Sequence, residues 1–384
     1  MAMNILMGQL AANGDCLYAT ILARQIRHDH PDCNLVWAVS RSCASMVENN
    51  PDIDSCWTLP LPEGQEAGWY WFQHEAHLML EKGEFDRIVL SQVWPANFQR
   101  FDGTVRPSLL RAYGAPITVP IQPVLALSAS ECDSADAFMK SSGAADLSHR
   151  ILFECASNSG QSDVTPAFAL RVAELVLAQQ PDTAFIMSSA QPVQSDDRRI
   201  VSAHGIPLRQ NAALSRHCSL LVGCASGVTV TTTSTSGASL PMIQLLKSGR
   251  SVYASFEHDH RHWGLPTEGI IELLDASPEQ AAECILDACR AGIAAAKERH
   301  HMAIPLDFAF YWKLVNGSLM KKGRYIDTAA SLSVTAERYG WLPELLHLAR
   351  KKVAWMLPHD TRYAFPSRRR EAERFLETIH SVSP

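Results

Sequence analysis

The same series of sequence features occurs twice in the chain, first from about residue 4 and again from about residue 150. Each copy starts with a short apolar run (4–10 and 150–155), passes through a loop of small and polar residues (11–15 and 156–163), and enters a segment with apolar residues at helical spacing. A Pro-Asp pair then ends each predicted helix and leads into another apolar run, as proline after a helix usually does. Two separate β-loop-α-β openings predict an α/β protein with two doubly wound, Rossmann-like domains, not one large sheet.

The length and composition agree with two folded domains. A chain of 384 residues exceeds one ordinary domain, and 47% hydrophobic with 19% charged residues is typical of a soluble globular protein. No apolar run is long enough to span a membrane, and "MAMNILMGQLAA" lacks the basic start of a signal peptide. The ten cysteines include no CxxC pair and mostly lie in apolar runs, which favours reduced core residues and a cytoplasmic location.

Three regions are expected: an N-terminal Rossmann-like domain over 1–147, a second over 148–306, and a helical C-terminal region over 307–384. The stretch 125–149 is rich in Ser, Ala and Asp and indicates the connection between the domains. Further predicted elements are buried strands within 85–93, 218–227 and 240–246 and an amphipathic helix over 279–301.

Ligands of open α/β sheets bind outside the carboxyl ends of the strands, which directs attention to three loops, 11–15, 156–163 and 223–229. Asp15 is explained either as a cap at a helix start or as a general base in a cleft. The loop "GCASGVT" (223–229) is explained either as a tight strand-helix turn or as a phosphate site with Ser226 and Thr229 hydroxyls. The threonine-rich run after it predicts a short or irregular helix.

The residues around these loops resemble a known family. "NGDCLYATILARQIRHDHPDCNLVWAVSRSCASMVENNPDIDSCWTLP" (13–60) resembles the opening of the heptosyltransferase-like glycosyltransferases of family 9. "ILFECASNSG" (151–160) stands where that family begins its donor domain, and "NAALSRHCSLLVGCASGVT" (211–229) resembles its donor stretch. The resemblance covers roughly residues 4–60 and 150–246, in the right order and spacing.

The resemblance implies a GT-B glycosyltransferase, with two domains facing each other across a cleft. It implies inverting, metal-independent transfer from a nucleotide-sugar donor to a glycan or lipopolysaccharide-type acceptor, with no cofactor. Asp15 matches the catalytic aspartate of the family. The residues that the resemblance and loop positions nominate beside it are Asn13 and Gly14 on the acceptor side, and Ser157, Asn158, Ser159, Gly160, Gly223, Ser226, Gly227 and Thr229 at the donor phosphates.

Three departures from the family pattern weaken the donor site. Ala225 stands where the family has an acid, Val230 stands where it has a histidine, and no Lys or Arg is evident after the first strand of the second domain. Two alternatives to a sugar transferase therefore stay open: a nucleotide-sugar epimerase or hydrolase on the same scaffold, and a catalytically silent binding relative.

The stretch "FEHDHRHWG" (256–264) combines three histidines with acids. A metal site is disfavoured because alternate residues of an extended chain face the same way, without the spread that a tetrahedral site needs. The favoured explanation is a polar loop at the cleft, in which Glu257, His258 and His260 contact the donor.

The C-terminal end is basic although the whole chain carries a net charge of −6. Residues 350–384 contain eight Lys or Arg and four Asp or Glu, a net +4, which leaves −10 for residues 1–349. Such an end suits either peripheral contact with an anionic membrane at its inner face or a solvated helical surface. No nucleic-acid partner is expected.

Overall fold

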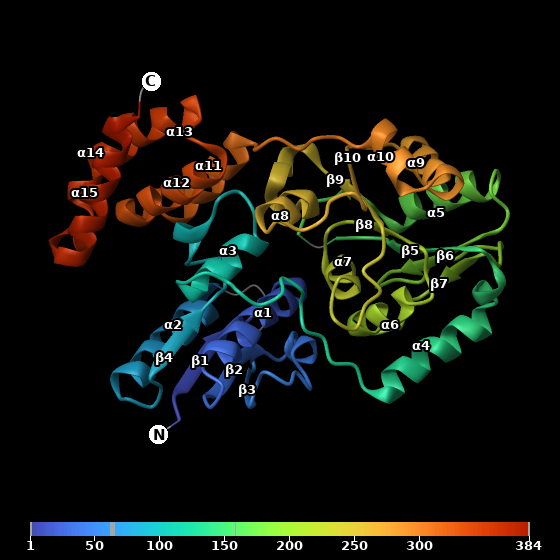
Figure 1. Ribbon diagram of the computed structural model, residues 1–384, viewed down its shortest axis with the longest axis horizontal. Helices are drawn as coiled ribbons and strands as arrows, with labels where there is room; N and C mark the ends of the chain where they lie inside the picture. The colour runs from blue at the N-terminus through green and yellow to red at the C-terminus, as the bar shows by residue number, and fades with distance from the viewer. Residues whose placement is uncertain (1, 62–65, 158, 383–384) are drawn as a thin grey trace.

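The computed structural model describes residues 2–61, 66–157 and 159–382. Figure 1 shows two α/β units with a helical region beside the first of them. In the described residues, the first unit has a four-stranded sheet of order β3-β2-β1-β4 and the second a six-stranded sheet of order β10-β9-β8-β5-β6-β7, with all pairs parallel. The strands of the first sheet are β1 (Asn4–Gly8), β2 (Asn34–Ser40), β3 (Ser55–Leu59) and β4 (Arg87–Leu90). Those of the second are β5 (His149–Glu154), β6 (Thr183–Ser188), β7 (Ile200–Ser202), β8 (Leu220–Gly223), β9 (Met242–Leu246) and β10 (Ile270–Leu274).

The direction of winding reverses once in each sheet, between β1 and β4 and between β5 and β8. The predicted strands at 4–10 and 150–155 are thus the central strands β1 and β5, which explains why the last four residues of each are buried. A doubly wound sheet leaves a crevice at such a reversal, outside the carboxyl ends of the strands. The loops after β1, β5 and β8 all start at these ends.

The helices of the first unit are α1 (Asn13–Asp29), α2 (Glu66–Glu81) and α3 (Arg106–Leu110). The segment 125–149, predicted as a plain connection, contains the helix α4 (Ala129–Ser142). Ser128 and Glu131 form a capping box at its start, and this local pattern explains why the polar stretch is helical.

The helices of the second unit are α5 (Pro166–Leu177), α6 (Asn211–Ser215), α7 (Gly227–Thr232), α8 (Phe256–His262), α9 (Pro278–Ala291) and α10 (Ile293–His300). The single helix predicted over 279–301 is wrong, because Gly292 lies between α9 and α10 with φ +86°. Glycine takes this conformation without the steric cost that a side chain would bring. The short α7 confirms the expectation from its threonine-rich sequence.

The C-terminal region is helical, as predicted from residue 307 onward. It contains α11 (Phe308–Ser318), α12 (Tyr325–Tyr339), α13 (Pro343–Leu348), a π-helical turn (Ala349–Val353), α14 (Ala354–Met356) and α15 (Pro366–Ser381). It packs on the segment around Phe101, whose ring stacks on Tyr311 at a centroid distance of 6.0 Å. None of the helices in the described ranges combines the length and apolar composition needed to cross a bilayer.

One cluster of buried apolar side chains connects all three regions. It includes Leu17 of α1, Val228 of α7 and Leu332 of α12. Two further clusters fill the outer faces of the sheets, one around Phe72 and one around Phe185. The two α/β units therefore meet through packed side chains around a cavity that both of them line.

Candidate functional site

A cavity of about 390 Å³ lies between the two α/β units. The first unit contributes residues 12–15, at the start of α1, and residues 105–106. The second contributes the loop after β5, the end of β6 and the loop between β8 and α7. The cavity thus lies at the reversal points of both sheets, where a doubly wound fold binds its ligands.

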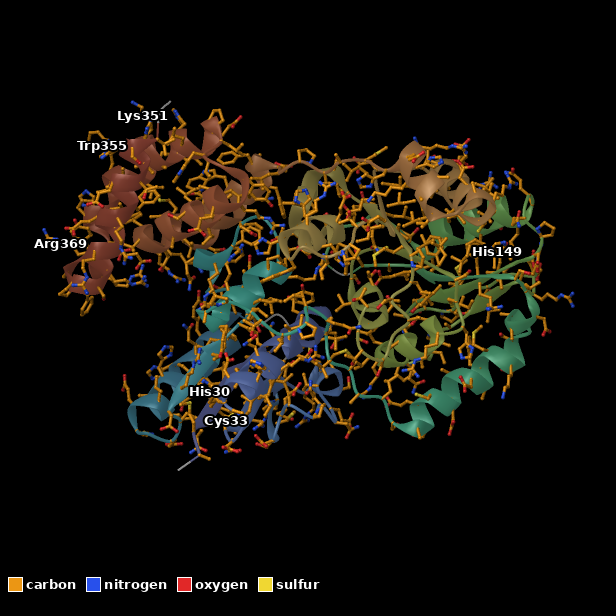
Figure 2. All side chains as sticks on the ribbon, viewed as in Figure 1. His30, Cys33, His149, Lys351, Trp355 and Arg369 are labelled. Carbon is orange, nitrogen blue, oxygen red and sulfur yellow. The ribbon has the colours of Figure 1, made fainter. Side chains whose placement is uncertain are left out.

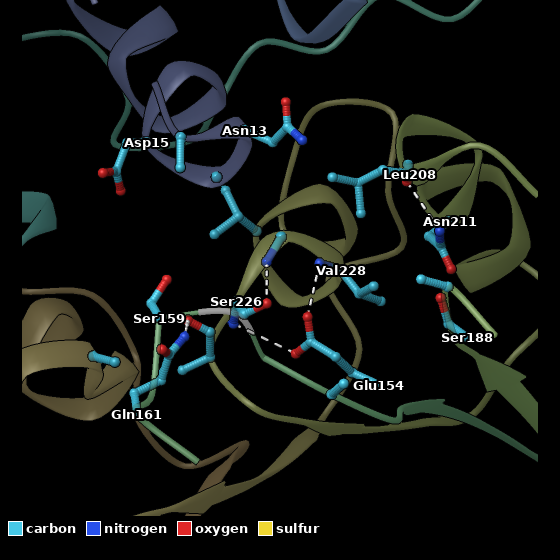
Figure 3. Close-up of a pocket in the computed structure, with 18 of the residues that line it drawn as sticks. Asn13, Asp15, Glu154, Ser159, Gln161, Ser188, Leu208, Asn211, Ser226 and Val228 are labelled. Carbon is cyan, nitrogen blue, oxygen red and sulfur yellow. Dashed lines mark hydrogen bonds between the residues drawn. The ribbon is translucent and has the colours of Figure 1, made fainter. Parts of the chain in front are cut away.

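Asp15 lies on the wall that the first unit contributes (Figure 3). It belongs to the first turn of α1, whose N-cap position is Ala12 and has no side-chain cap. A carboxylate in this turn interacts favourably with the helix dipole. Asn13 and Gly14 line the same wall, and a Cβ on Gly14 would meet Gly227 Cα at 3.7 Å, an ordinary contact across the two units.

Glu154, the last residue of β5, forms the floor of the cavity and is 1% exposed. Its carboxylate accepts hydrogen bonds from the backbone N–H of Cys224 (2.7 Å) and Val228 (2.9 Å) and from the Thr229 hydroxyl (2.8 Å), as Figure 3 shows in part. A more distant bond comes from Ser226 N–H at 3.4 Å. The protein's own carboxylate therefore takes up donors that an incoming phosphate would use.

The remaining N–H groups of this loop also have acceptors within the chain. Ala225 N–H donates to Gln244 Oε1 at 2.7 Å, and Gly227 N–H donates to Ser226 Oγ at 2.7 Å. Thr229 is fully buried, and Gly223 is required sterically because a Cβ there would lie 2.4 Å from Thr229 Oγ1. Of the predicted phosphate residues in this loop, Ser226 and Gly227 line the cavity, whereas Gly223 and Thr229 support it from behind.

The loop after β5 approaches the cavity from the other side. Ser159 lines it and is exposed, Ser157 is half-buried, and Asn158 lies outside the described residues. Gly160 has φ +69°, and a Cβ there would lie 2.9 Å from Nη2 of Arg250. Backbone conformation and close packing both favour glycine at this position.

Several polar atoms on the wall of the cavity have no hydrogen-bond partner among the described residues. They are Asn13 Oδ1, Gln161 Oε1 and Asn211 Oδ1. Gln161 is 4% exposed and Asn211 is 1% exposed, and their side chains lie beside the cavity in Figure 3. Buried polar atoms are normally satisfied, so unpartnered ones at a cavity indicate groups that a ligand completes.

Two guanidinium groups and a neutral phenol lie at or near this wall. Arg106 and Tyr253 line the cavity, and Arg250 lies near Gly160 with its guanidinium 4.9 Å from the centroid of the Phe310 ring. Burial and the negative charge of Asp15 raise the pKa of Tyr253 to about 12, while Arg250 and Arg106 oppose the shift. The cavity is thus lined by the acids Asp15 and Glu154 and by Arg106, with Arg250 nearby.

The stretch 256–262 is the helix α8, which corrects the predicted polar loop. Ser255 caps it by accepting from His258 N–H, and its first N–H groups donate to Glu272 of β10. Glu257 is buried in ion pairs with Lys297 and His301, and the His258 and His260 rings bond to backbone carbonyls. Among described residues, no group of three or more potential ligands is arranged to hold a metal ion.

Glu257, His258 and His260 therefore lie away from the cavity that contains Asp15. Conversely, sequence reasoning missed Glu154, Gln161, Asn211, Arg106, Arg250 and Tyr253. Glu154 carried a signal, since an acid ends the buried strand "ILFE" directly before a loop. Arg106 carried none, because its position depends on contacts with residues far along the chain.

No protein-family model matches the chain, and no curated protein matches it. A solved structure, the glycosyl transferase family 9 from Veillonella parvula, superposes with a TM-score of 0.52 at 18% identity, over 71% of this chain and 86% of that one. Two E. coli structures give lower scores: ADP-heptose lps heptosyltransferase II (0.49, 13% identity, 76% and 98% covered) and heptosyltransferase WaaC with ADP (0.47, 10%, 76% and 99%). The first match shows a shared fold, which confirms the predicted GT-B architecture.

Proposed function

We propose that the protein is a glycosyltransferase that moves a sugar from a nucleotide-sugar donor to a hydroxyl group of a glycan or glycolipid acceptor. The observation that carries this proposal is Asp15 on the wall of the cavity, opposite the strand ends of the second sheet of a GT-B fold. Fold alone would not choose the reaction, since one scaffold serves many. A carboxylate beside a cavity with unpartnered polar groups supports it.

In the proposed reaction, Asp15 removes the proton from the acceptor hydroxyl, and the oxygen attacks the anomeric carbon of the donor. The new C–O bond forms as the bond to the nucleoside diphosphate breaks on the opposite face, so the configuration inverts. The departing diphosphate gains negative charge, and stabilising that charge is usually a large part of catalysis.

Arg250 is the proposed partner of that charge, because the guanidinium of Arg106 is already paired with buried Asp259. The loop between β8 and α7 supplies few free donors, because Glu154 and Gln244 already accept from it. Ser159, Ser226 and Gln161 would orient the donor phosphates, and Asn211 would contact the donor further along the cleft. No metal or other cofactor takes part in this proposal.

A catalytically silent binding protein is the second candidate, and Glu154 favours it. Its carboxylate places negative charge on the cavity floor near the expected position of the diphosphate, next to the departures at Ala225 and Val230. Like charges in a poorly solvated site repel, so nucleotide binding would be weakened. This candidate shares the fold and the cavity and differs in chemistry.

The test is a thermal-shift panel of ADP, GDP, UDP, CDP, CMP, dTDP and NAD on the full chain. A ligand that binds the folded state raises the melting temperature by mass action. The transferase proposal expects a clear shift with one nucleoside diphosphate. Silence across the panel would support the binding-protein candidate and contradict the transferase.

The panel is followed by transfer assays with the matching sugar donor and the variant Asp15→Asn. Loss of the general base is expected to lower transfer about 10²–10⁴-fold while the nucleotide shift is retained. Asp32→Asn, in the exposed Pro-Asp turn after α1, is the matched control and is expected to keep full activity. Unchanged transfer by Asp15→Asn would rule out Asp15 as the base.

A further inference from the structure

A second cavity, of about 440 Å³, lies next to the first and shares Arg106 with it. Its walls come from α1, from residues 121–123, from residues 239–242 and from α8 with the loop that follows. Most of the lining side chains are apolar or aromatic, among them Leu240, Phe256 and Trp263. This second cavity has no assigned role in the sugar transfer proposed above.

The polar end of the second cavity is the ion pair between Arg106 and Asp259. Arg106 Nε–H donates to Asp259 Oδ2, its Nη2 donates to the carbonyl of Ala254, and its guanidinium lies 3.9 Å from the centroid of the Phe256 ring. Both side chains are about 5% exposed. The Arg106 side chain is therefore fixed by three contacts, with Asp259, with the Ala254 carbonyl and with the Phe256 ring.

One carboxylate oxygen of this ion pair accepts no hydrogen bond from the described residues. Asp259 Oδ1 is buried and has no hydrogen-bond partner among the described residues. A buried carboxylate oxygen without a donor is costly, and such an atom facing a cavity indicates a missing donor. Burial and the nearby charge of Asp259 raise the pKa of Tyr18, which lines the same cavity, so its hydroxyl stays neutral.

The charges of Arg106 and Asp259 determine which kind of ligand group can donate a hydrogen bond to Asp259 Oδ1. Arg106 already balances the charge of Asp259, so a cationic ligand would bring an unbalanced charge into a poorly solvated place. An anionic ligand would meet the unpartnered oxygen with repulsion. A neutral hydroxyl group can donate to Asp259 Oδ1 without either cost, and an apolar body can fill the remaining volume.

We propose that the second cavity is a binding site for a neutral, mainly apolar molecule that bears one hydroxyl group, which donates to Asp259 Oδ1. The site adjoins the cleft, since Arg106 lines both cavities and Tyr18 follows Asp15 by one turn of α1. Binding at this site does not depend on sugar transfer, and it would stand if the transferase proposal failed.

The test uses the full chain and three probes of similar shape: 4-ethylphenol, ethylbenzene and 4-ethylbenzoate. Isothermal titration is expected to give saturable binding of 4-ethylphenol and binding of ethylbenzene about tenfold weaker, because one hydrogen bond to a charged group is lost. 4-Ethylbenzoate is expected not to bind. Equal binding of all three probes, or binding of none, would overturn the proposal.

Two variants place the probe in the cavity. Leu240→Trp and Ile121→Trp place larger side chains at two positions of its lining and are expected to abolish 4-ethylphenol binding while the circular dichroism spectrum stays unchanged. Leu78→Trp, on α2 and away from the cavity, is the matched control and is expected to bind as the wild type does. If a folded cavity-filling variant binds the probe normally, the ligand site lies elsewhere and the proposal is wrong.

Discussion

At the scale of single residues, the floor of the first cavity depends on the buried carboxylate of Glu154. Glu154 holds the loop between β8 and α7 through the N–H groups of Cys224 and Val228 and the hydroxyl of Thr229. Removing a buried acceptor leaves each of these donors unsatisfied. We expect Glu154 to be required for the folded shape of the cavity floor, whatever the protein binds there.

The variant Glu154→Ala tests this role. It is expected to lower the free energy of unfolding by about 3 kcal/mol, because several buried donors lose a charged acceptor. Urea denaturation followed by circular dichroism measures the change. Glu174→Ala, an acid on α5 that is about half exposed, is the matched control and is expected to change little. A change below 1 kcal/mol for Glu154→Ala would contradict the role.

Glu272 of β10 makes stability depend on pH. It is fully buried, and burial raises its pKa from 4.5 to about 7 although Ser255 O–H and the N–H groups of Phe256 and Glu257 donate to it. Between those two pH values the folded state keeps a proton that the unfolded state has lost. The contribution of Glu272 to stability is therefore fully present below pH 4.5 and is lost as the pH rises through 7.

The variant Glu272→Gln, which imitates the protonated acid, is expected to lack this dependence. From pH 5 to pH 7.5 its stability should improve relative to the wild type by on the order of 2–3 kcal/mol. Urea denaturation at each pH provides the comparison. Glu279→Gln, an exposed acid of α9, should follow the wild-type curve. Parallel curves for wild type and Glu272→Gln would show that the Glu272 pKa is not raised.

At the scale of elements, α8 shows why its segment was predicted as a loop. The sequence "FEHDHRH" has no apolar spacing that indicates a helix. Its first N–H groups bond to Glu272, a residue of a strand that comes later in the chain, and its carboxylates pair with Arg106 and Lys297. Tertiary contacts of this kind override weak local preference and leave no local signal.

The C-terminal helices modify the predicted membrane contact. Arg350 donates to the carbonyl of Ile379, and Arg362 and Arg368 pair with Asp327. These three cations therefore make contacts within the C-terminal helical region. Lys351 and Lys352 are exposed, and Trp355 is 75% exposed. Figure 2 shows Lys351 and Trp355 close together at the outer edge of the molecule. If the region contacts an anionic membrane, this corner is the expected place, since basic and interfacial aromatic side chains act together there.

Vesicle sedimentation tests the membrane contact. Replacing Lys351 and Lys352 by Gln is expected to weaken binding to phosphatidylglycerol vesicles about tenfold or more, at roughly 1 kcal/mol for each lysine. Added salt should weaken wild-type binding as well. Lys82→Gln with Lys140→Gln removes the same charge from exposed positions on the first unit and on α4, and should have little effect. Absence of wild-type binding would contradict the contact.

At the scale of the whole molecule, Arg338 of α12 connects the three regions. It donates to Asp102 Oδ2 (2.9 Å) and to Thr104 Oγ1 (2.9 Å) of the first unit and to the carbonyl of His258 (2.7 Å) of the second. Burial alone would raise the pKa of Asp102, but Arg111 and Arg338 hold it well below its usual range. The helical region thus connects the two units through the contacts of one side chain.

The variant Arg338→Met is expected to lower the free energy of unfolding by about 3 kcal/mol, because it leaves the buried Asp102 with one cation fewer. Urea denaturation gives the value. Arg374→Met, an exposed cation on α15, is the control and should lie within about 0.5 kcal/mol of the wild type. Equal stability of the two variants would show that Arg338 does not connect the regions energetically.

The two repeated strand-loop-helix segments predicted the architecture because the residues that define each segment lie close together in the sequence. The apolar runs, the Pro-Asp turns and the loop with Asp15 follow one another in a short stretch, and they correctly located β1, β5 and the edge of both sheets where the cavity lies. The pairs Arg106–Asp259 and Arg338–Asp102 join residues more than 150 positions apart. A single sequence contains no signal for such pairs, so the second cavity and the connection by α12 required the structure.

The position of Arg338 in the sequence, after all the strands of both sheets, has a consequence for biosynthesis. A ribosome releases the N-terminus first, so both sheets are complete before α12 emerges. Until α11 emerges Phe101 lacks the ring of Tyr311 that stacks on it, and until α12 emerges Asp102 lacks one of its two cations. A nascent chain that stops before residue 307 would therefore expose an apolar and acidic seam. Docking of α11 and α12 on this seam is therefore the step that completes the contacts of Asp102 and Phe101.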